Sequence, residues 1–553
     1  MMKSIVSINP KDAKLTMAFL YVAFISLLLG VTAGLLQVLV RSGKVTLPAG
    51  IDYYQVLTVH GVLLALVLTT FFIIGFIFAT QSKTAGTYSD GERRWGWIAY
   101  WIMTIGVAIT ATFILLGESS VLYTMYAPLM AHPLHYIGLT LVVVGSWICS
   151  FVIFHRHARW KKEHPGQVTP LLSFMAVSTM IMWLVACLGL ATTVLVQIIP
   201  WSLKLVPTID VLISRTLFWY FGHPLVYFWL LPAYMAWYGI VPKIIGGKIF
   251  SDALARLSFV LFILFSIPVG FHHQLLEPGI DPFWKYLQVV LTFLVVIPSL
   301  MTAFALFATF EMRGRELGAT GLMGWWKKLP WKDVRFLAPF IGMVFFAFGG
   351  AGGLVNASHQ MNQVVHNTIW ITGHFHLTVG SAVMMTFFGV TFWLVPSITG
   401  RKLTPKMNKV ALVQTWLWTI GMVFMSGAMH TAGLLGAPRR SAFSTYASNL
   451  DSLAWIPYQI AQAVGGSILF LGGLLMVFIF FNLAFSAPKG EEEFPIAEVH
   501  DKAEKVPMIF ENFKVWVVVT IALVLFAYTI PFIDMIQNAP PGSPGFTNVI
   551  GRQ

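Results

Sequence analysis

Long apolar runs and short polar links alternate along almost the whole chain. About 20 predominantly apolar residues are enough for a helix to cross a bilayer, with a working range of roughly 17 to 25. Runs of this length lie near residues 16–40, 55–80, 95–117, 132–154, 170–198, 210–241, 253–270, 286–310, 336–354, 365–397, 410–436, 456–485 and 512–533. The pattern predicts an all-α integral membrane protein with about thirteen transmembrane helices.

The composition is typical of a chain whose main solvent is lipid. Hydrophobic residues make up 57% of the 553 residues and charged residues only 10%, whereas a soluble domain has about 25% charged residues. Cys149 and Cys187 both fall inside predicted spans, so they form neither a disulfide framework nor a zinc site. The N-terminal residues contain no short apolar segment with a cleavage site, so no cleaved signal peptide is expected.

Lysine and arginine are distributed unevenly between the polar links. With a cytoplasmic N-terminus, 25 of the 35 lysine and arginine residues fall in cytoplasmic segments and only seven in outside segments. Because positive residues are retained on the cytoplasmic side, we expect the N-terminus in the cytoplasm and, after thirteen spans, the C-terminus outside. The net charge of +13 therefore reflects topology and requires no nucleic-acid partner.

Some histidines lie in predicted membrane spans, where lipid or protein rather than water surrounds them. Six of them fall within predicted spans or at their outer ends: His60, His223, His272, His273, His374 and His376. A single such histidine is more often a packed, hydrogen-bonded side chain than a ligand. Polar groups are costly in a membrane and tend to mark functional sites. All six also fall in the outer half of the predicted spans, which is not expected of scattered structural histidines.

The spacing of His374 and His376 in "GHFHL" separates them on a helix. Two residues correspond to roughly 200° around the helix axis. The two side chains therefore cannot share one metal without breaking the helix. They can, however, hold two metal centres on opposite faces of it.

His272 and His273 in "FHHQ" have different surroundings. They follow Pro268 and Gly270, where a regular helix is expected to end. From such an irregular end, adjacent imidazoles can converge on one ion together with His223. Three imidazoles are a ligand set that suits copper or zinc.

Taken together, these motifs resemble subunit I of the haem–copper terminal oxidases. "TVHG" at 58–61, "HPLVY" at 223–227, "HH" at 272–273 and "HFH" at 374–376 occur in the order and spacing of that family. The resemblance covers about residues 16–440. No soluble domain is visible in the sequence, so residues 1–553 are expected to form a single polytopic membrane domain, with the catalytic core in 16–440 and additional helices and a cytoplasmic connector in 441–553.

The resemblance implies two haems. His60 and His376 would be the axial ligands of a low-spin haem, expected to be haem b. His374 would be the proximal ligand of a high-spin haem of a or o type. A haem with two histidine ligands is coordinatively full and transfers electrons, whereas a five-coordinate haem can bind dioxygen.

The resemblance also implies a copper ion, CuB, held by His223, His272 and His273. His223 and Tyr227 are four residues apart and so share one helix face. In the family such a pair is covalently joined, and the tyrosine donates an electron and a proton when the O–O bond breaks. Tyr227 and His223 are therefore the expected catalytic residues.

The absence of carboxylates from the predicted spans indicates the subclass of oxidase that the chain resembles. Leu225 stands where the common mitochondrial-like class has glutamate, and no Asp or Glu lies inside any predicted span. The chain therefore looks most like the B-type oxidases, in which hydroxyl groups carry protons. The candidate proton path is Tyr227, Tyr234, Tyr238, Ser251, Ser299 and Thr302. The alternative is that the tyrosines only pack and that Ser and Thr bond back to their own helix.

Two arginines and two neighbouring polar residues are expected near the haem propionates. Arg439 and Arg440 lie in "APRRSAF" at 437–443, just outside a span, and His366 and Asn362 lie on the same side. Guanidinium groups pair well with carboxylates, although solvated loop arginines are the simpler alternative. B-type relatives usually carry Asp at the position of Asn362, which puts in doubt a proton-loading role that needs a carboxylate there.

These features predict the catalytic subunit of a proton-translocating terminal respiratory oxidase that reduces dioxygen to water. A nitric oxide reductase is the nearest alternative, but that family has a glutamate near a non-haem iron and lacks the linked tyrosine. A secondary transporter also has many spans and midplane polar residues; six ligand-type histidines at matched depth argue against it.

The electron donor is left open by the sequence. The chain lacks the two cysteines in a soluble domain that a CuA site needs, so a cytochrome c oxidase would require a partner subunit II carrying CuA. A quinol oxidase would need no CuA. The B-type resemblance favours cytochrome c, a small additional membrane subunit and a location in a prokaryotic plasma membrane.

Overall fold

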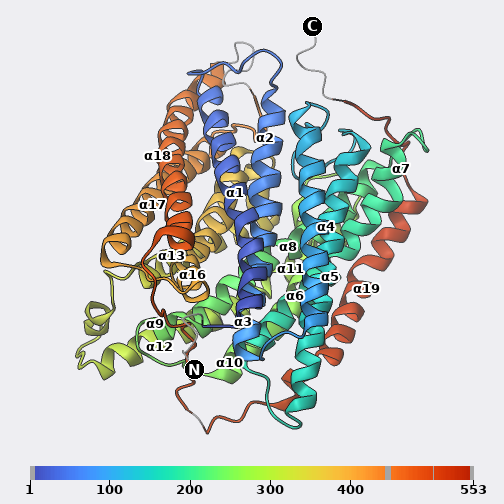
Figure 1. Ribbon diagram of the computed structural model, residues 1–553. Helices are drawn as coiled ribbons and strands as arrows, with labels where there is room; N and C mark the ends of the chain where they lie inside the picture. Colours follow the sequence, from blue (N-terminus) through green and yellow to red (C-terminus); the bar gives the residue numbers. More distant parts are fainter. Residues whose placement is uncertain (1–6, 443–449, 502, 548–553) are drawn as a thin grey trace.

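The computed structural model describes residues 7–442, 450–501 and 503–547. Helices supply nearly all the regular structure of these residues, and strand pairing among them is limited to isolated bridges. Twelve helical segments in the described ranges are long and apolar enough to cross a membrane. They stand side by side as a bundle with roughly parallel long axes (Figure 1). The all-α membrane architecture predicted from the apolar runs is confirmed.

The first half of the chain supplies six of these segments, some of them interrupted by π-helical turns. They are α1 (Pro10–Arg41), α2–η1–α3 (Tyr53–Gly61, Val62–Leu68, Thr69–Thr84), α4 (Asp90–Leu115), α5 (Pro133–Glu163), α6–η2–α7 (Leu171–Thr192, Thr193–Ile198, Ile199–Ser202) and α8–α9 (Val211–Gly239, Val241–Ile244).

The second half supplies the other six. They are α11–α12 (Pro282–Phe293, Val296–Glu316), α13 (Val334–Ala357), α15–η5–α16 (Ile369–Leu377, Thr378–Val383, Met384–Thr399), α17 (Pro405–Leu434), η6–α18–η7 (Leu450–Trp455, Ile456–Phe481, Asn482–Ser486) and α19 (Phe513–Gln537). Shorter elements lie between or beside them: α10 (Asp252–Ser266), η3 (Phe271–Gln274), η4 (Gly324–Lys328), α14 (His359–Val365) and η8 (Met508–Glu511).

The predicted span at 253–270 is the short helix α10, which has 15 residues and is too short to count among the twelve full-length spans. It ends at Ser266, and the chain then turns through Pro268 and Gly270 into the single 3₁₀ turn η3. The expected end of the regular helix before "FHHQ" is thus confirmed. All thirteen predicted runs correspond to helical segments, and the helix in the run 253–270 ends before the run does.

Local sequence explains where several helices begin. The Asn9 side chain accepts a hydrogen bond from Lys11 N at the start of α1, and Pro10 occupies the first helical position. Ser89 and Glu92 form a capping box at the start of α4. Side-chain acceptors of this kind satisfy backbone N–H groups that have no partner within the helix.

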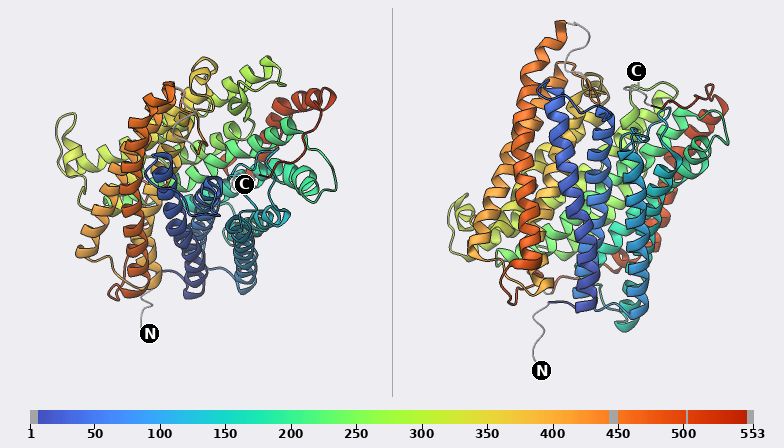
Figure 2. Two further views of the ribbon diagram at one scale, coloured as in Figure 1. Left: turned by 90° about the horizontal axis from the view of Figure 1, so that it is seen from above. Right: turned by 45° about the horizontal axis from the view of Figure 1, so that its top comes forward.

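Neighbouring helices pack in antiparallel pairs, of which α4 with α5, α17 with α18 and α1 with α18 share extensive contacts. The last pair brings the first helix of the chain against α18 at one edge of the bundle, whereas α19 lies at the opposite edge (Figure 2). We use "inner end" for the end of the bundle where α1 begins and "outer end" for the end where α1 stops. α19 finishes at the outer end (Figure 1), and the assignment of the inner end to the cytoplasm stays a prediction.

The polar connector that follows α18 runs across the inner end of the bundle. Ala497 N donates to Gly239 O at 2.8 Å, and Ile249 N donates to Glu498 O at 2.8 Å. The Glu504 carboxylate accepts hydrogen bonds from the Ser251 hydroxyl and, at 2.8 Å, from Asp252 N. The connector therefore holds the start of α10 as well as joining α18 to α19.

Two π-helical segments follow the predicted low-spin haem ligands directly. η1 begins two residues after His60, and η5 begins two residues after His376. The Ser381 hydroxyl donates to His376 O at 2.9 Å inside the second of them. Such widened turns are frequent at functional sites, and here each one follows a histidine directly along the chain.

Candidate functional site

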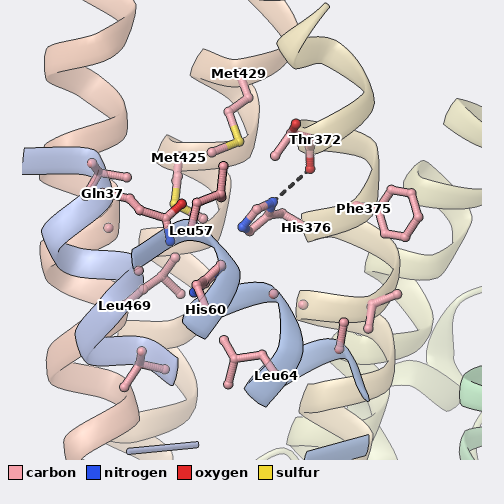
Figure 3. A pocket seen from close by; sticks show the side chains of 18 of the residues that line it. Gln37, Leu57, His60, Leu64, Thr372, Phe375, His376, Met425, Met429 and Leu469 are labelled. Carbon is pink, nitrogen blue, oxygen red and sulfur yellow. Dashed lines mark hydrogen bonds between the residues drawn. The ribbon is translucent and has the colours of Figure 1, made fainter. Parts of the chain in front are cut away.

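His60 from α2 and His376 from α15 face each other across a gap. Their ring centres are 6.3 Å apart and their planes differ by only 15°. Two imidazole nitrogens that each bond a metal at about 2 Å need ring centres roughly 6 Å apart. The spacing therefore leaves room for one metal ion between two nearly parallel rings (Figure 3).

The orientation of both rings is fixed by backbone carbonyls. His60 Nδ1 lies 2.9 Å from Gly30 O, and His376 Nδ1 lies 2.8 Å from Thr372 O. Because a carbonyl oxygen can only accept, each Nδ1 must carry the hydrogen. The lone pair of each ring is then on Nε2, which is the atom left for a metal.

The rings open into a cavity of about 250 Å³. Its walls are mostly apolar, with Leu64, Met425 and Leu469 among them, and Phe375 lines it from α15 (Figure 3). A methyl group on Gly34 would come within 2.8 Å of His60 Nδ1, so that position has no space for a side chain. The cavity suits a flat, apolar group that is held by two imidazoles.

His374 lies on the same helix as His376 but serves another part of the structure. His376 lines the cavity and His374 does not. The His374 ring is parallel to Trp370 within 13°, at 6.1 Å. A methyl on Gly352 of α13 would reach within 2.9 Å of His374 Nδ1. The two histidines of α15 thus have different surroundings, as the two-residue spacing predicts, and the binding of a second metal centre by His374 stays a prediction.

His223, His272 and His273 form the one group of three metal-ligating side chains found in the described ranges, and their ligand atoms all lie within 4.8 Å of one another. His223 comes from α8, and the other two come from η3. The ring centres of His223 and His272 are 4.3 Å apart, and those of His272 and His273 are 4.2 Å apart. His223 Nδ1 lies 3.3 Å from His273 Nε2. These imidazoles can hold a single copper or zinc ion.

A tryptophan that the sequence analysis missed supports this centre. The Trp219 indole stacks on the His273 ring with centres 3.8 Å apart and planes 5° apart. Trp219 precedes His223 by four residues, so both side chains lie on one face of α8. That spacing was the available signal, but only the fold shows which histidine the indole meets.

Tyr227 lies beside His223 as the helix spacing predicts. The two ring centres are 5.0 Å apart, at an angle of 65°. His223 Nε2 is buried and has no hydrogen-bond partner among the described residues. A buried nitrogen without a partner is uncommon, so this atom marks a place where a further bond is expected.

The predicted hydroxyl path is partly assembled. The Tyr238 hydroxyl donates to Thr302 Oγ1 at 3.0 Å and lies 3.5 Å from Ser258 Oγ. Ser299 lies beside the Tyr234 hydroxyl. Ser258 was not among the predicted residues, although it lies seven residues after Ser251 and so on the same face of α10.

The outer part of the path has less direct contact. Tyr227 and Tyr234 both pack against the Phe262 ring, with centres 5.8 and 5.3 Å away. At the inner end, Ser251 Oγ accepts from Leu254 N at 3.1 Å as the N-cap of α10, and the same hydroxyl donates to Glu504. The structure therefore brings a carboxylate from the connector to the predicted inner residue.

Basic side chains gather at the outer end of the cavity. Arg439 and Arg440 both line it, and no ion pair in the described ranges includes either of them. Arg439 donates to Asn367 Oδ1 at 2.7 Å, and the guanidinium groups of Arg215 and Arg440 lie over the Tyr126 ring at 4.5 and 4.8 Å. Burial, and then the charge of Arg440, lower the pKa of Arg439 to about 10. An anionic group at this place would relieve that repulsion.

Asn362 and His366 form a fixed pair nearby. Asn362 is fully buried, and its amide nitrogen donates to Asn356 O at 2.6 Å and to Asn356 Oδ1 at 2.9 Å. Its oxygen lies 2.9 Å from His366 Nδ1, which must therefore carry the hydrogen. Burial, and then the charge of Arg439, lower the pKa of His366 to about 4, so this histidine is neutral at pH 7.

Comparison with known proteins gives a consistent match. The family described as cytochrome c and quinol oxidase polypeptide I matches residues 14–468. Cytochrome c oxidase subunit 1 of Thermus thermophilus is 39% identical over 543 residues, which cover 96% of each chain. A solved structure of a heme-copper terminal oxidase dimer is 36% identical, covers 98% of this chain and 96% of its own, and superposes with a TM-score of 0.92. Quinol oxidase subunit 1 of Sulfolobus acidocaldarius is 26% identical over 269 residues, covering 48% of each chain.

Proposed function

The chain belongs to the family of cytochrome c and quinol oxidase polypeptide I, and from this premise we propose that it is the catalytic subunit of a proton-translocating terminal oxidase that reduces dioxygen to water. It is a multi-pass protein of a prokaryotic plasma membrane. The observation that carries the proposal is that the two histidines of α15 have different surroundings. His376 completes a pair of parallel rings around a cavity, while His374, two residues earlier, faces away from it.

The family implies haem groups and a copper ion, and the residues present fit them. His60 and His376 would hold the low-spin haem, proposed to be haem b, through the two free Nε2 atoms. Its propionates would extend toward Arg439 and Arg440, which line the cavity and form no ion pair with another described residue. Asn362 and His366 would border that region as a neutral, hydrogen-bonded pair.

His374 would bind the iron of a high-spin haem of a or o type. His223, His272 and His273 would hold CuB, since their three ligand atoms lie within 4.8 Å of one another. When bound, the high-spin haem and the copper ion would supply the redox chemistry of dioxygen reduction, and the low-spin haem would supply electron transfer to them. The chain's own residues would hold these groups and deliver protons to them.

Tyr227 is proposed as the residue next to the metal centre that donates a proton and an electron. The unpaired His223 Nε2 beside it is the atom through which the covalent bond of the family would form. A bond there would remove the hydrogen-bonding deficit of a buried nitrogen. It would also fix the phenol beside the site where dioxygen reacts.

Protons would reach Tyr227 from the inner end through hydroxyl groups. The proposed order is Ser251, Tyr238 with Thr302, Tyr234 with Ser299, and then Tyr227. The contact of Tyr238 with Thr302 at 3.0 Å supports its central step. Ser251 is already paired with Glu504, so a carboxylate from the connector stands at the start of the path.

The electron donor is proposed to be cytochrome c, through a CuA domain of a partner subunit II, with a small additional membrane subunit completing the complex. The long match to a cytochrome c oxidase subunit 1 supports this donor. The shorter match to a quinol oxidase subunit keeps quinol as the second candidate. Nitric oxide reduction is disfavoured by Leu225 and Tyr227, because a glutamate and no linked tyrosine are typical of that family.

Residues 1–553 are proposed to act as one membrane domain. The core in 16–440 contains all the metal-site residues, and 441–553 adds α18, the connector and α19. Contacts of α19 with α10 and α11 support one unit rather than an independent module.

A pair of measurements on the purified complex tests the function. Reduced cytochrome c should support dioxygen uptake, and uptake supported only by quinol would assign the other donor. His272→Ala should abolish copper binding and dioxygen uptake, because one of three imidazoles is lost, while the low-spin haem remains reducible. Wild-type copper content with full turnover in this variant would contradict the ligand set.

A further inference from the structure

One face of α11 lies against the turn that carries His272 and His273. Lys285, Gln288 and Thr292 are three and four residues apart, so they form a single stripe on the helix. All three side chains are buried, at 8%, 0% and 7% exposure. Buried polar side chains in a membrane protein need partners, and here most of the partners belong to residues 270–277.

Gln288 binds the backbone where the chain is broken after α10. Its Oε1 accepts from Gly270 N at 2.8 Å and from Phe271 N at 2.7 Å. Its amide nitrogen donates to Ala527 O of α19 at 3.4 Å. The two backbone N–H groups would otherwise be left unpaired at the break. Gln288 thus fixes the backbone immediately before His272.

Lys285 holds the other side of the same turn. Its Nζ donates to Leu275 O at 3.1 Å and to Glu277 O at 2.5 Å. The turn that carries the two histidines is therefore anchored before and after them. Both anchors come from one helix.

Thr292 acts on the imidazole itself. Its Oγ1 lies 2.6 Å from Gln288 O and 3.0 Å from His272 Nδ1. A threonine hydroxyl has one hydrogen, and the carbonyl oxygen can only accept it. The hydroxyl oxygen is then left as an acceptor, so His272 Nδ1 must donate. Neutral His272 consequently has its free lone pair on Nε2.

The bond from Thr292 to Gln288 O is a common helix feature, and the additional contact with His272 is what distinguishes this threonine. Thr391 of α16 makes the same bond to its own helix, to Phe387 O at 2.8 Å, and is also buried. Among the described residues, no hydrogen bond joins it to an imidazole. It therefore serves as a matched control.

We propose that Thr292 and Gln288 are positioning residues of the three-histidine centre: Thr292 sets the tautomer and the direction of the His272 ring, and Gln288 holds the broken backbone that carries it. The proposal rests on the proposed function in one respect, that His272 binds copper. It adds that a hydroxyl on a neighbouring helix decides which nitrogen does so. Partners of ligand histidines usually change metal affinity about 10- to 100-fold when removed.

Two substitutions at position 292 separate the hydroxyl from the shape of the side chain. Thr292→Val keeps the volume and loses the hydroxyl, whereas Thr292→Ser keeps the hydroxyl and loses the methyl group. Each holoenzyme is dialysed against a copper chelator, and copper per haem is measured. The infrared stretch of carbon monoxide bound to copper after photolysis reports the ligand geometry directly.

We expect Thr292→Val to retain copper about 10- to 100-fold less tightly and to shift the carbon monoxide band. Thr292→Ser and the control Thr391→Val should behave like the wild type. The low-spin haem spectrum should be unchanged in all of them. Gln288→Leu should also weaken copper retention, while Gln288→Glu, which keeps an acceptor oxygen for Gly270 N and Phe271 N, should weaken it less.

Three results would overturn the proposal. They are wild-type copper retention and band position in Thr292→Val, failure of Thr292→Ser to match the wild type, and loss of the low-spin haem in Thr292→Val, which would make the hydroxyl a general requirement for folding. Failure of the proposed function is distinguishable, because the wild-type complex would then hold no copper from the start.

Discussion

The proposed low-spin haem pocket, which contains His60 and His376, and the three-histidine centre are built in different ways. In the pocket, both rings are oriented by backbone carbonyls, of Gly30 for His60 and of Thr372 for His376. At the centre, side chains do this work: the Thr292 hydroxyl meets His272, and the Trp219 indole stacks on His273.

The difference follows from the chain around each site. Both pocket histidines lie in helices, and the irregular turns η1 and η5 begin only after them. The carbonyl for His376 comes from its own helix, and the carbonyl for His60 comes from Gly30 of α1. His272 and His273 lie in a single 3₁₀ turn after a broken helix. A short turn offers few fixed acceptors, so other helices must supply them. The pocket should therefore tolerate side-chain changes around its ligands better than the centre does.

Removing a ligand histidine should have the largest effect, and it tests whether the pocket and the three-histidine centre are separate sites. His60→Ala or His376→Ala should eliminate the low-spin haem, since one imidazole cannot hold a six-coordinate iron, and should leave copper bound. Haem extraction and copper analysis of the purified variants measure both. His272→Ala is the reciprocal control, with copper lost and the low-spin haem kept. A bis-histidine spectrum retained in either pocket variant would show that the pair is wrongly assigned.

The fold was largely predictable because lipid imposes a simple rule on the sequence. A spanning helix needs a long apolar run, and each of the thirteen runs corresponds to a helical segment. The end of α10 was predictable for a local reason as well, because Pro268 and Gly270 close together disfavour a regular helix. The two faces of α15 followed from the helical period alone.

The supports of the metal centre were not predictable from the sequence. Thr292 is 20 residues from His272, and Glu504 is 253 residues from Ser251. A threonine in an apolar helix has the same local pattern whether it meets a ligand or only its own backbone, as Thr391 does. Only the packing of α11 against η3 distinguishes them.

A substitution with a smaller expected effect tests Tyr227, which lies beside His223 of the centre. Tyr227→Phe should leave both haems and copper bound but reduce turnover by about 100-fold or more, the range of a lost proton donor. Steady-state dioxygen uptake and metal analysis measure the two effects. Tyr227 does not line the pocket, so the reduction rate of the low-spin haem should not change. Turnover within twofold of the wild type would exclude Tyr227 from the reaction.

Proton supply gives the prediction with the smallest expected effect, because the proposed hydroxyl path would lead to the three-histidine centre and not to the pocket. The hydroxyls of Thr302 and Ser258 donate to their own helices, to Pro298 O at 2.9 Å and Leu254 O at 3.0 Å. The hydrogen of Tyr238 is therefore the one that is donated between helices, to Thr302 at 3.0 Å. Without it, the step between α8 and α12 loses its direct donor.

Tyr238→Phe keeps the ring and its packing, so the haems, copper and carbon monoxide binding should be unchanged. Proton uptake from the inner end should slow by roughly tenfold, less than the 100-fold or more of a lost catalytic donor, because water can partly replace a hydroxyl that positions no reacting atom. Flow-flash kinetics with a pH indicator measures this step. Tyr220→Phe is the control, since its buried hydroxyl lies near Val185 O, outside the path. Uptake at the wild-type rate in Tyr238→Phe would mean that Tyr238 only packs, and the proton route to the centre would have to bypass Thr302.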